Sequence, residues 1–244
     1  MNDRDIKAST FWMFGAILAF SLTAVAGREA ITMPEVGGLD KSLSISQLVF
    51  FRNVIGLGVI LLLLSFHYLR KGQVTLKSRY LKLHIGRNIT HFLGQWCWFY
   101  GLAILPLAQV FAIEFTVPIW TAIFAGFLLK ERLTPARIVA LVLGFAGVLL
   151  ILRPGYTTIE WASWVVLFSA IFYSLSHTLT KRISGYDGAL TILLYMHLIQ
   201  LPLALLLVIF DFAWPQGIVW VYVVLTAIAA MSAHYCMAKA LSYS

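Results

Sequence analysis

Long apolar segments alternate with short polar ones along almost the whole chain. Eight of the apolar segments approach or exceed the roughly 20 residues with which a helix crosses a bilayer. Their approximate bounds are Thr10 to Ile31, Leu43 to Phe66, Leu81 to Leu102, Leu105 to Leu129, Pro135 to Leu152, Trp161 to Leu179, Ala189 to Phe210 and Gly217 to Ala238. The pattern predicts an all-α integral membrane protein with eight transmembrane helices.

Composition supports this fold class and leaves no room for a separate soluble domain. Hydrophobic residues make up 61% of the 244 positions and charged residues 11%, whereas soluble domains average about 45–50% and 25%. With a cytoplasmic N-terminus, the predicted outer loops hold only three basic residues, Arg28, Lys41 and Arg153. Most of the other Lys and Arg residues then lie in inner loops, as the positive-inside rule requires. The net charge of +8 is therefore explained by topology, and we expect no nucleic-acid partner.

Two charged residues lie deep in predicted helices. Arg52 is nine residues from Leu43 and Glu114 is nine residues from Leu105, so both lie about 14 Å below the outer ends of their helices. Opposite charges at one depth can meet, either as a buried pair that fixes helix packing or as a substrate or proton site. Pro118, one turn after Glu114, is expected to bend the helix beside the acid.

Further polar residues repeat at helical spacing. Arg87, His91 and Gln95 share one face of the third segment, and Tyr173 and His177 share one face of the sixth. Such faces are expected to turn away from lipid and to line a central wet path. The alternative for His91 is a neutral histidine that only packs and accepts a hydrogen bond.

Four glycines within the predicted helices, Gly56, Gly58, Gly144 and Gly147, are expected at close helix contacts. Small residues allow helix backbones to approach each other in lipid.

An internal repeat relates the two ends of the chain. Residues 95–102 align with 234–241 at an offset of 139, and residues 21–22 align with 174–175 at an offset of 153. Together, the two offsets pair the first predicted helix with the sixth and the third with the eighth. This pairing predicts a five-helix unit that is repeated with inverted orientation. Residues 1–152 would form the first repeat and 153–244 an incomplete second one. The missing two helices would extend the chain to about 290 residues.

Several short motifs, in order and spacing, resemble the drug/metabolite transporter superfamily, in particular its EamA-type ten-helix members. The motifs are Phe51-Arg52-Asn53, Trp98-Phe99-Tyr100-Gly101-Leu102, Pro118, Leu128-Leu129-Lys130-Glu131-Arg132-Leu133, Gly144-Phe145-Ala146-Gly147-Val148 and Tyr235 through Leu241. The resemblance implies an inner-membrane carrier of small polar or amphipathic metabolites such as amino acids, often an exporter, with cytoplasmic termini.

The leading hypothesis is a secondary carrier that works by alternating access. Arg52 and Glu114 would form its central site, and the site would be lined by His91, Gln95, Tyr173 and His177. We expect a small-molecule substrate and the lipid bilayer as partners, with a homodimer as an option, and no catalytic residues, metal or cofactor. The alternatives are a truncated inactive fragment, a membrane protein that depends on a partner, and an intramembrane enzyme. The enzyme is disfavoured because no nucleophile–base spacing is present.

Overall fold

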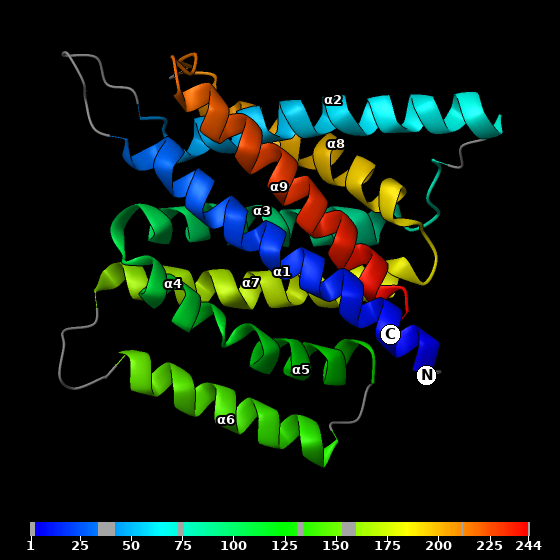
Figure 1. The fold of residues 1–244 in the computed structure, drawn as a ribbon, viewed down its shortest axis with the longest axis vertical. Helices are drawn as coiled ribbons and strands as arrows, with labels where there is room; N and C mark the ends of the chain where they lie inside the picture. Colours follow the sequence, from blue (N-terminus) through cyan, green and yellow to red (C-terminus); the bar gives the residue numbers. More distant parts are fainter. Residues whose placement is uncertain are drawn as a thin grey trace. The chain divides into compact units, whose positions relative to one another are not determined.

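All the regular secondary structure in the described part of the chain is α-helical. The computed structural model describes residues 3–33, 42–72, 76–130, 134–152, 160–210 and 212–243. Within these ranges it contains nine helices and no strand (Figure 1). They are α1 (Asp3–Thr32), α2 (Ile45–Lys71), α3 (Leu81–Ile104), α4 (Leu107–Glu114), α5 (Val117–Leu128), α6 (Pro135–Leu152), α7 (Trp161–Ser184), α8 (Ala189–Val208) and α9 (Val219–Leu241). The predicted all-α class is confirmed, and each predicted segment corresponds to one helix or, for Leu105 to Leu129, to α4 and α5.

Within the described residues, six helical stretches are long and apolar enough to cross a membrane. They are Asp5–Thr32, Ile45–Arg70, Leu107–Leu128, Trp161–Ser184, Ala189–Val208 and Val219–Leu241. The helix α6 contributes a shorter apolar stretch, Ile138–Leu150. Large apolar side chains are exposed, including Leu62 at 72% and Phe127 at 82%, as expected for a surface covered by lipid tails. The chain is a multi-pass membrane protein.

The long helix α3 carries several buried polar side chains. Five of its polar residues have no exposed surface, namely His84, Arg87, Asn88, His91 and Gln95. Burying such groups is costly unless other protein groups satisfy them. The interior position of these side chains therefore depends on the neighbouring helices.

The chain divides into two compact units. The first consists of Met1–Asn88 and Thr180–Ser244, and the second of Ile89–Leu179. The first unit therefore combines α1 and α2 with α8 and α9, and it also holds the beginning of α3 and the end of α7. The second unit holds the rest of α3 and α7 together with α4, α5 and α6.

In the first unit, α1 runs antiparallel to α9 (Figure 1). Near the beginning of α1, Ser9 Oγ donates a hydrogen bond to Ala240 O, 3.1 Å away. Further along, the rings of Phe20 and His234 meet edge to face with centroids 5.1 Å apart. The two contacts fix the register of α1 against α9.

The helix α2 packs along α8 and has well-defined ends. Its first turn forms a capping box, in which Gln47 N donates to Ser44 Oγ and Ser44 N donates to Gln47 Oε1. Its last turn closes at Gly72, whose φ of 65° is the left-handed conformation that glycine adopts easily. Between these ends, the buried side chains of Ile60 and Leu64 pack against Leu193 and Leu194.

In the second unit, the helix around Glu114 is interrupted. The helix α4 ends at Glu114 and α5 begins at Val117, with Pro118 in its first turn. Thr116 caps the break by donating from Oγ1 to Ile113 O, 2.7 Å away. Ser174 Oγ of α7 lies 2.6 Å from Ala170 O and 3.0 Å from Val117 O, so its single proton is shared between the two carbonyls. Pro118 has no N–H to donate to the carbonyl one turn back, and the helix is interrupted beside the acid.

The four glycines that the sequence predicts at close helix contacts lie in different environments. A Cβ on Gly56 would overlap the His197 ring, whereas a Cβ on Gly58, Gly144 or Gly147 would have no described atom within 4 Å. The prediction of a close contact is confirmed for Gly56. Over the described residues it is wrong for the other three, because those glycines face outward on their helices.

A tighter contact involves Gly101 of α3, where a Cβ would overlap Val166 Cγ2 of α7. We expect Gly101→Ala to lower the free energy of unfolding by about 1–3 kcal/mol, because Val166 is fully buried and β-branched. Thermal unfolding of the purified protein in detergent measures this. The matched control, Gly144→Ala on α6, should leave the midpoint unchanged or raise it slightly. Equal effects of the two changes would contradict the contact.

Candidate functional site

The six predicted site residues fall into both compact units. Arg52 belongs to the first unit, and the other five, Glu114, His91, Gln95, Tyr173 and His177, belong to the second. Each unit is therefore described separately, and the pairing of Arg52 with Glu114 stays a prediction.

Within the second unit, α3 and α7 bring three of the predicted residues together. The ring centroids of His91 and Tyr173 lie 5.3 Å apart. The rings of Tyr173 and His177 are nearly parallel, with an interplanar angle of 9° and centroids 5.9 Å apart. His91 is fully buried, whereas Tyr173 and His177 are half-buried. The three rings form a continuous row that can present nitrogen and hydroxyl groups to a polar solute.

The close approach of α3 and α7 at Gly94 positions this row. A Cβ on Gly94 would lie 3.2 Å from Tyr173 Cδ1 and 3.3 Å from Tyr173 N. One turn earlier on α7, Ser169 Oγ donates to Gly94 O at 2.9 Å. Because Gly94 has no side chain and its carbonyl accepts this hydrogen bond, Tyr173 of α7 can lie against α3. The contact is about one turn beyond His91 along α3.

Glu114 joins the row through Trp98 of α3. Its carboxyl group lies beside the indole of Trp98, which is 5% exposed. The Trp98 ring in turn meets Tyr173 edge to face, with centroids 6.5 Å apart. Gln95 is fully buried on α3 between His91 and Trp98. The second unit thus places four of the predicted residues in one chain of contacts, linked by Trp98.

The first unit holds a second buried polar cluster, around His197 of α8. His197 is 2% exposed and Arg52 is 3% exposed. Asn53 Nδ2 donates to Val49 O at 2.8 Å, so Asn53 Oδ1 is an acceptor, and it lies 3.1 Å from His197 Nδ1. The charges of Arg52 and Arg87 both act on the His197 ring. The cluster therefore combines two guanidinium groups with a histidine whose Nδ1 carries its proton.

Arg87 is held in place by neutral oxygens. Its Nε donates to Thr180 Oγ1 at 3.1 Å and its Nη1 donates to Asn88 Oδ1 at 2.6 Å. Gln200 Nε2 donates to the same Asn88 oxygen at 3.2 Å. These bonds connect α3, α7 and α8 within the first unit.

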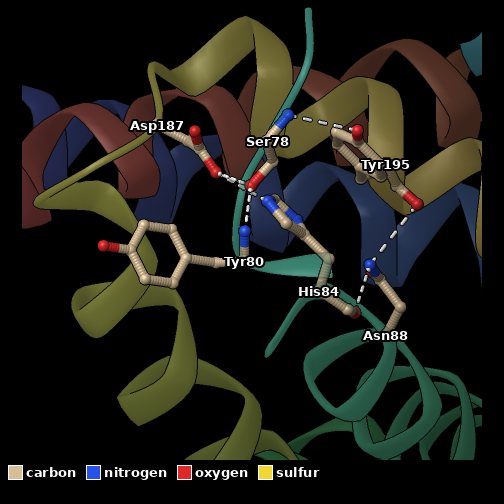
Figure 2. A network of polar contacts seen from close by, with 6 residues as sticks. All are labelled: Ser78, Tyr80, His84, Asn88, Asp187 and Tyr195. Atoms are coloured by element: carbon tan, nitrogen blue, oxygen red, sulfur yellow. Dashed lines mark hydrogen bonds and ion pairs between the residues drawn. The ribbon is translucent and has the colours of Figure 1, made fainter. Parts of the chain in front are cut away.

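A third network lies at the beginning of α3 (Figure 2). Asp187 Oδ2 accepts hydrogen bonds from Ser78 Oγ at 2.5 Å and from His84 Nε2 at 2.9 Å. The His84 ring stacks on Tyr195, with centroids 4.4 Å apart, and Tyr195 OH accepts from Ser78 N at 3.3 Å. His84 is fully buried and the Asp187 side chain is 12% exposed. The network ties the segment before α3 to the turn between α7 and α8.

Of the first-unit cluster, only Arg52 is among the predicted site residues. His197 and Gln200 lie one turn apart on one apolar segment, and Asn53 directly follows Arg52. That spacing is a usable signal, because polar residues at helical spacing in a membrane segment face protein. The Ser78–Asp187 contact had no such signal, since it joins two loops that are 109 residues apart.

Comparison with known proteins places the chain among membrane transporters. The sequence model of the EamA-like transporter family matches residues 7–153. A riboflavin transporter of Vibrio cholerae is 27% identical over 231 residues, which cover 94% of this chain and 74% of that protein. An S-adenosylmethionine uptake transporter of Rickettsia bellii is 28% identical over 149 residues, which cover 61% of this chain and 50% of that protein. The chain thus spans half to three quarters of the length of these relatives.

One solved crystal structure has a similar fold. It is 20% identical and superposes with a TM-score of 0.71, covering 97% of this chain and 79% of the other. The similarity concerns the fold alone.

Proposed function

Because the chain belongs to the EamA-like transporter family, we propose that it is a secondary carrier of small polar or amphipathic metabolites in the inner membrane. The main supporting observations are the burial of polar and charged side chains such as Arg52, Arg87 and His91 within apolar helices and the chain of contacts that runs from His91 to Glu114. Ionisable groups at membrane depth mark substrate and ion pathways. Named relatives that are transporters and not enzymes support the same class.

The relatives suggest which solutes to test first. Riboflavin is the first candidate, because the riboflavin transporter relative aligns with 94% of this chain. S-adenosylmethionine is the second, from a relative named for uptake. The resemblance described above implies export, and that direction stays a prediction. The match to residues 7–153 supports the proposal that residues 1–152 form the first repeat.

Each predicted residue receives a role in this proposal. Glu114 would bind an amine of the solute or a coupling proton, and Arg52 would attract a carboxylate. His91, Gln95, Tyr173 and His177 would line the path of the solute. The orientation with a cytoplasmic N-terminus follows from the basic loops.

Reconstitution into proteoliposomes tests the carrier directly. Radiolabelled riboflavin and S-adenosylmethionine are loaded inside or outside in separate experiments, with protein-free liposomes as the blank. Solute movement above the blank in either direction supports the carrier. No movement of these two solutes or of a mixture of amino acids would reject it.

We expect Glu114→Gln to lower solute flux by about tenfold or more, because the amide keeps the shape but can neither carry charge nor exchange a proton. Flux in proteoliposomes is compared at equal amounts of inserted protein. The matched control is Glu29→Gln, which changes an exposed acid at the end of α1 and should keep the flux of the unchanged protein. Normal flux through the Glu114→Gln protein would remove Glu114 from the mechanism.

A further inference from the structure

The His197 ring presents a buried hydrogen-bond acceptor that the contacts described above do not use. Its Nδ1 proton is donated to Asn53 Oδ1, 3.1 Å away, so Nε2 of the neutral ring carries a lone pair. His197 is 2% exposed, and its Nε2 has no hydrogen-bond partner anywhere in the described part of the chain. A buried polar atom without a partner is costly and rare, and it calls for an explanation.

The surroundings of His197 restrict what such a partner can be. Arg52 and Arg87 both act electrostatically on the ring, and guanidinium groups are permanently charged hydrogen-bond donors. A group that donates to Nε2 therefore enters a positive field. A cation would be repelled there. A hydrogen-bond donor that has an electron-rich oxygen on each side would be attracted, because both oxygens interact favourably with the positive guanidinium groups.

Packing keeps the ring in this position. The His197 ring lies directly against the backbone of Gly56, where a Cβ would be only 2.5 Å from Nε2. Asn53 is itself fixed by its bond to Val49 O. The acceptor is thus preorganised by α2, which lowers the entropy lost when a ligand binds.

We propose that His197 is a specificity-determining residue of the carrier, whose Nε2 accepts a hydrogen bond from an N–H of the solute that lies between two carbonyl oxygens. An imide edge of this kind places its N–H opposite Nε2 and its oxygens toward the field of Arg52 and Arg87. Riboflavin carries such an edge, with N3–H between two carbonyl groups. The inference rests on the carrier function proposed above and adds the part of the solute that is recognised.

A pair of flavins tests this with the unchanged protein. Riboflavin and its N3-methyl analogue differ in the N–H and in one added methyl group, and both fluoresce. Each is titrated against the full chain in lipid nanodiscs while flavin fluorescence is followed. We expect the N3-methyl analogue to bind about tenfold or more weakly, because it cannot donate to Nε2. Equal affinities for the two flavins would overturn the inference.

A substitution then locates the preference at His197. His197→Leu should bind both flavins with similar affinity, whereas His234→Leu, a buried histidine that packs on Phe20, should keep the preference for riboflavin. A preference that survives His197→Leu would overturn the inference. If His197→Leu does not fold, the two flavins on the unchanged protein still decide the question.

The outcomes separate this inference from the carrier function. Riboflavin flux together with equal binding of both flavins would overturn the role of His197 alone. Flux of S-adenosylmethionine without any riboflavin binding would overturn the imide assignment and leave the carrier standing. Absence of all flux and all binding would overturn both.

Discussion

Replacing Gly56 with alanine is expected to lower the free energy of unfolding by about 1–3 kcal/mol, because the new methyl group would overlap the buried His197 ring. The ring cannot retreat without losing its hydrogen bond to Asn53 Oδ1. The same displacement should weaken riboflavin binding by about tenfold. Thermal unfolding in detergent and flavin fluorescence titration measure the two effects.

Gly58 provides the control on the same helix. A Cβ at Gly58 would meet no atom within 4 Å in the described part of the chain. Gly58→Ala should therefore leave flavin binding unchanged and leave the unfolding midpoint unchanged or slightly higher, since alanine favours helix over glycine. If both alanines shift the midpoint equally, the cause is backbone propensity and not the His197 contact.

The second large effect is expected for Asp187→Asn in the network of Figure 2. Asp187 Oδ2 accepts from both Ser78 and His84, and His84 is fully buried. An amide replaces a charged acceptor with a neutral one and places an N–H where an acceptor is needed. We expect a loss of about 2 kcal/mol in unfolding free energy. Chemical or thermal unfolding in detergent provides the measurement.

Glu160→Gln is the matched control for this change. Glu160 is an exposed acid directly before α7, and an exposed charge in high dielectric contributes little. Its unfolding midpoint should equal that of the unchanged protein. If the Asp187→Asn protein also unfolds at that midpoint, the network contributes nothing to the stability of the first unit.

The positions of the helices can be predicted from hydropathy. The predicted segment Pro135 to Leu152 coincides with α6, and the predicted start of α3 at Leu81 is also observed. Hydrocarbon requires every backbone polar group to be satisfied within its own segment, so a long apolar run has few alternatives to a helix. Polar side chains at helical spacing predicted that His91 and Gln95 turn away from lipid, and both have no exposed surface. That they line the path of a solute stays a prediction.

The break after Glu114 shows where this local reasoning ends. Pro118 predicts a bend, and the structure shows an interruption of the helix at residues 115–116. Thr116 Oγ1 donates to Ile113 O beside the interruption, and Ser174 Oγ lies 3.0 Å from Val117 O. Ser174 belongs to α7, 57 residues from Val117, so no window around Pro118 contains this partner.

Hydropathy and the spacing of polar residues identify a helical membrane protein, the approximate bounds of its helices and the polar side chains that must turn away from lipid. The partners of those side chains emerge only in the folded chain: Trp98 beside Glu114, Asn53 beside His197, Asp187 beside Ser78 and His84. The physical reason is that burial depends on transfer free energy, which is a property of each side chain and its segment. Partnership depends on the rotation and crossing point of each helix, which are set by close packing between residues far apart in the chain.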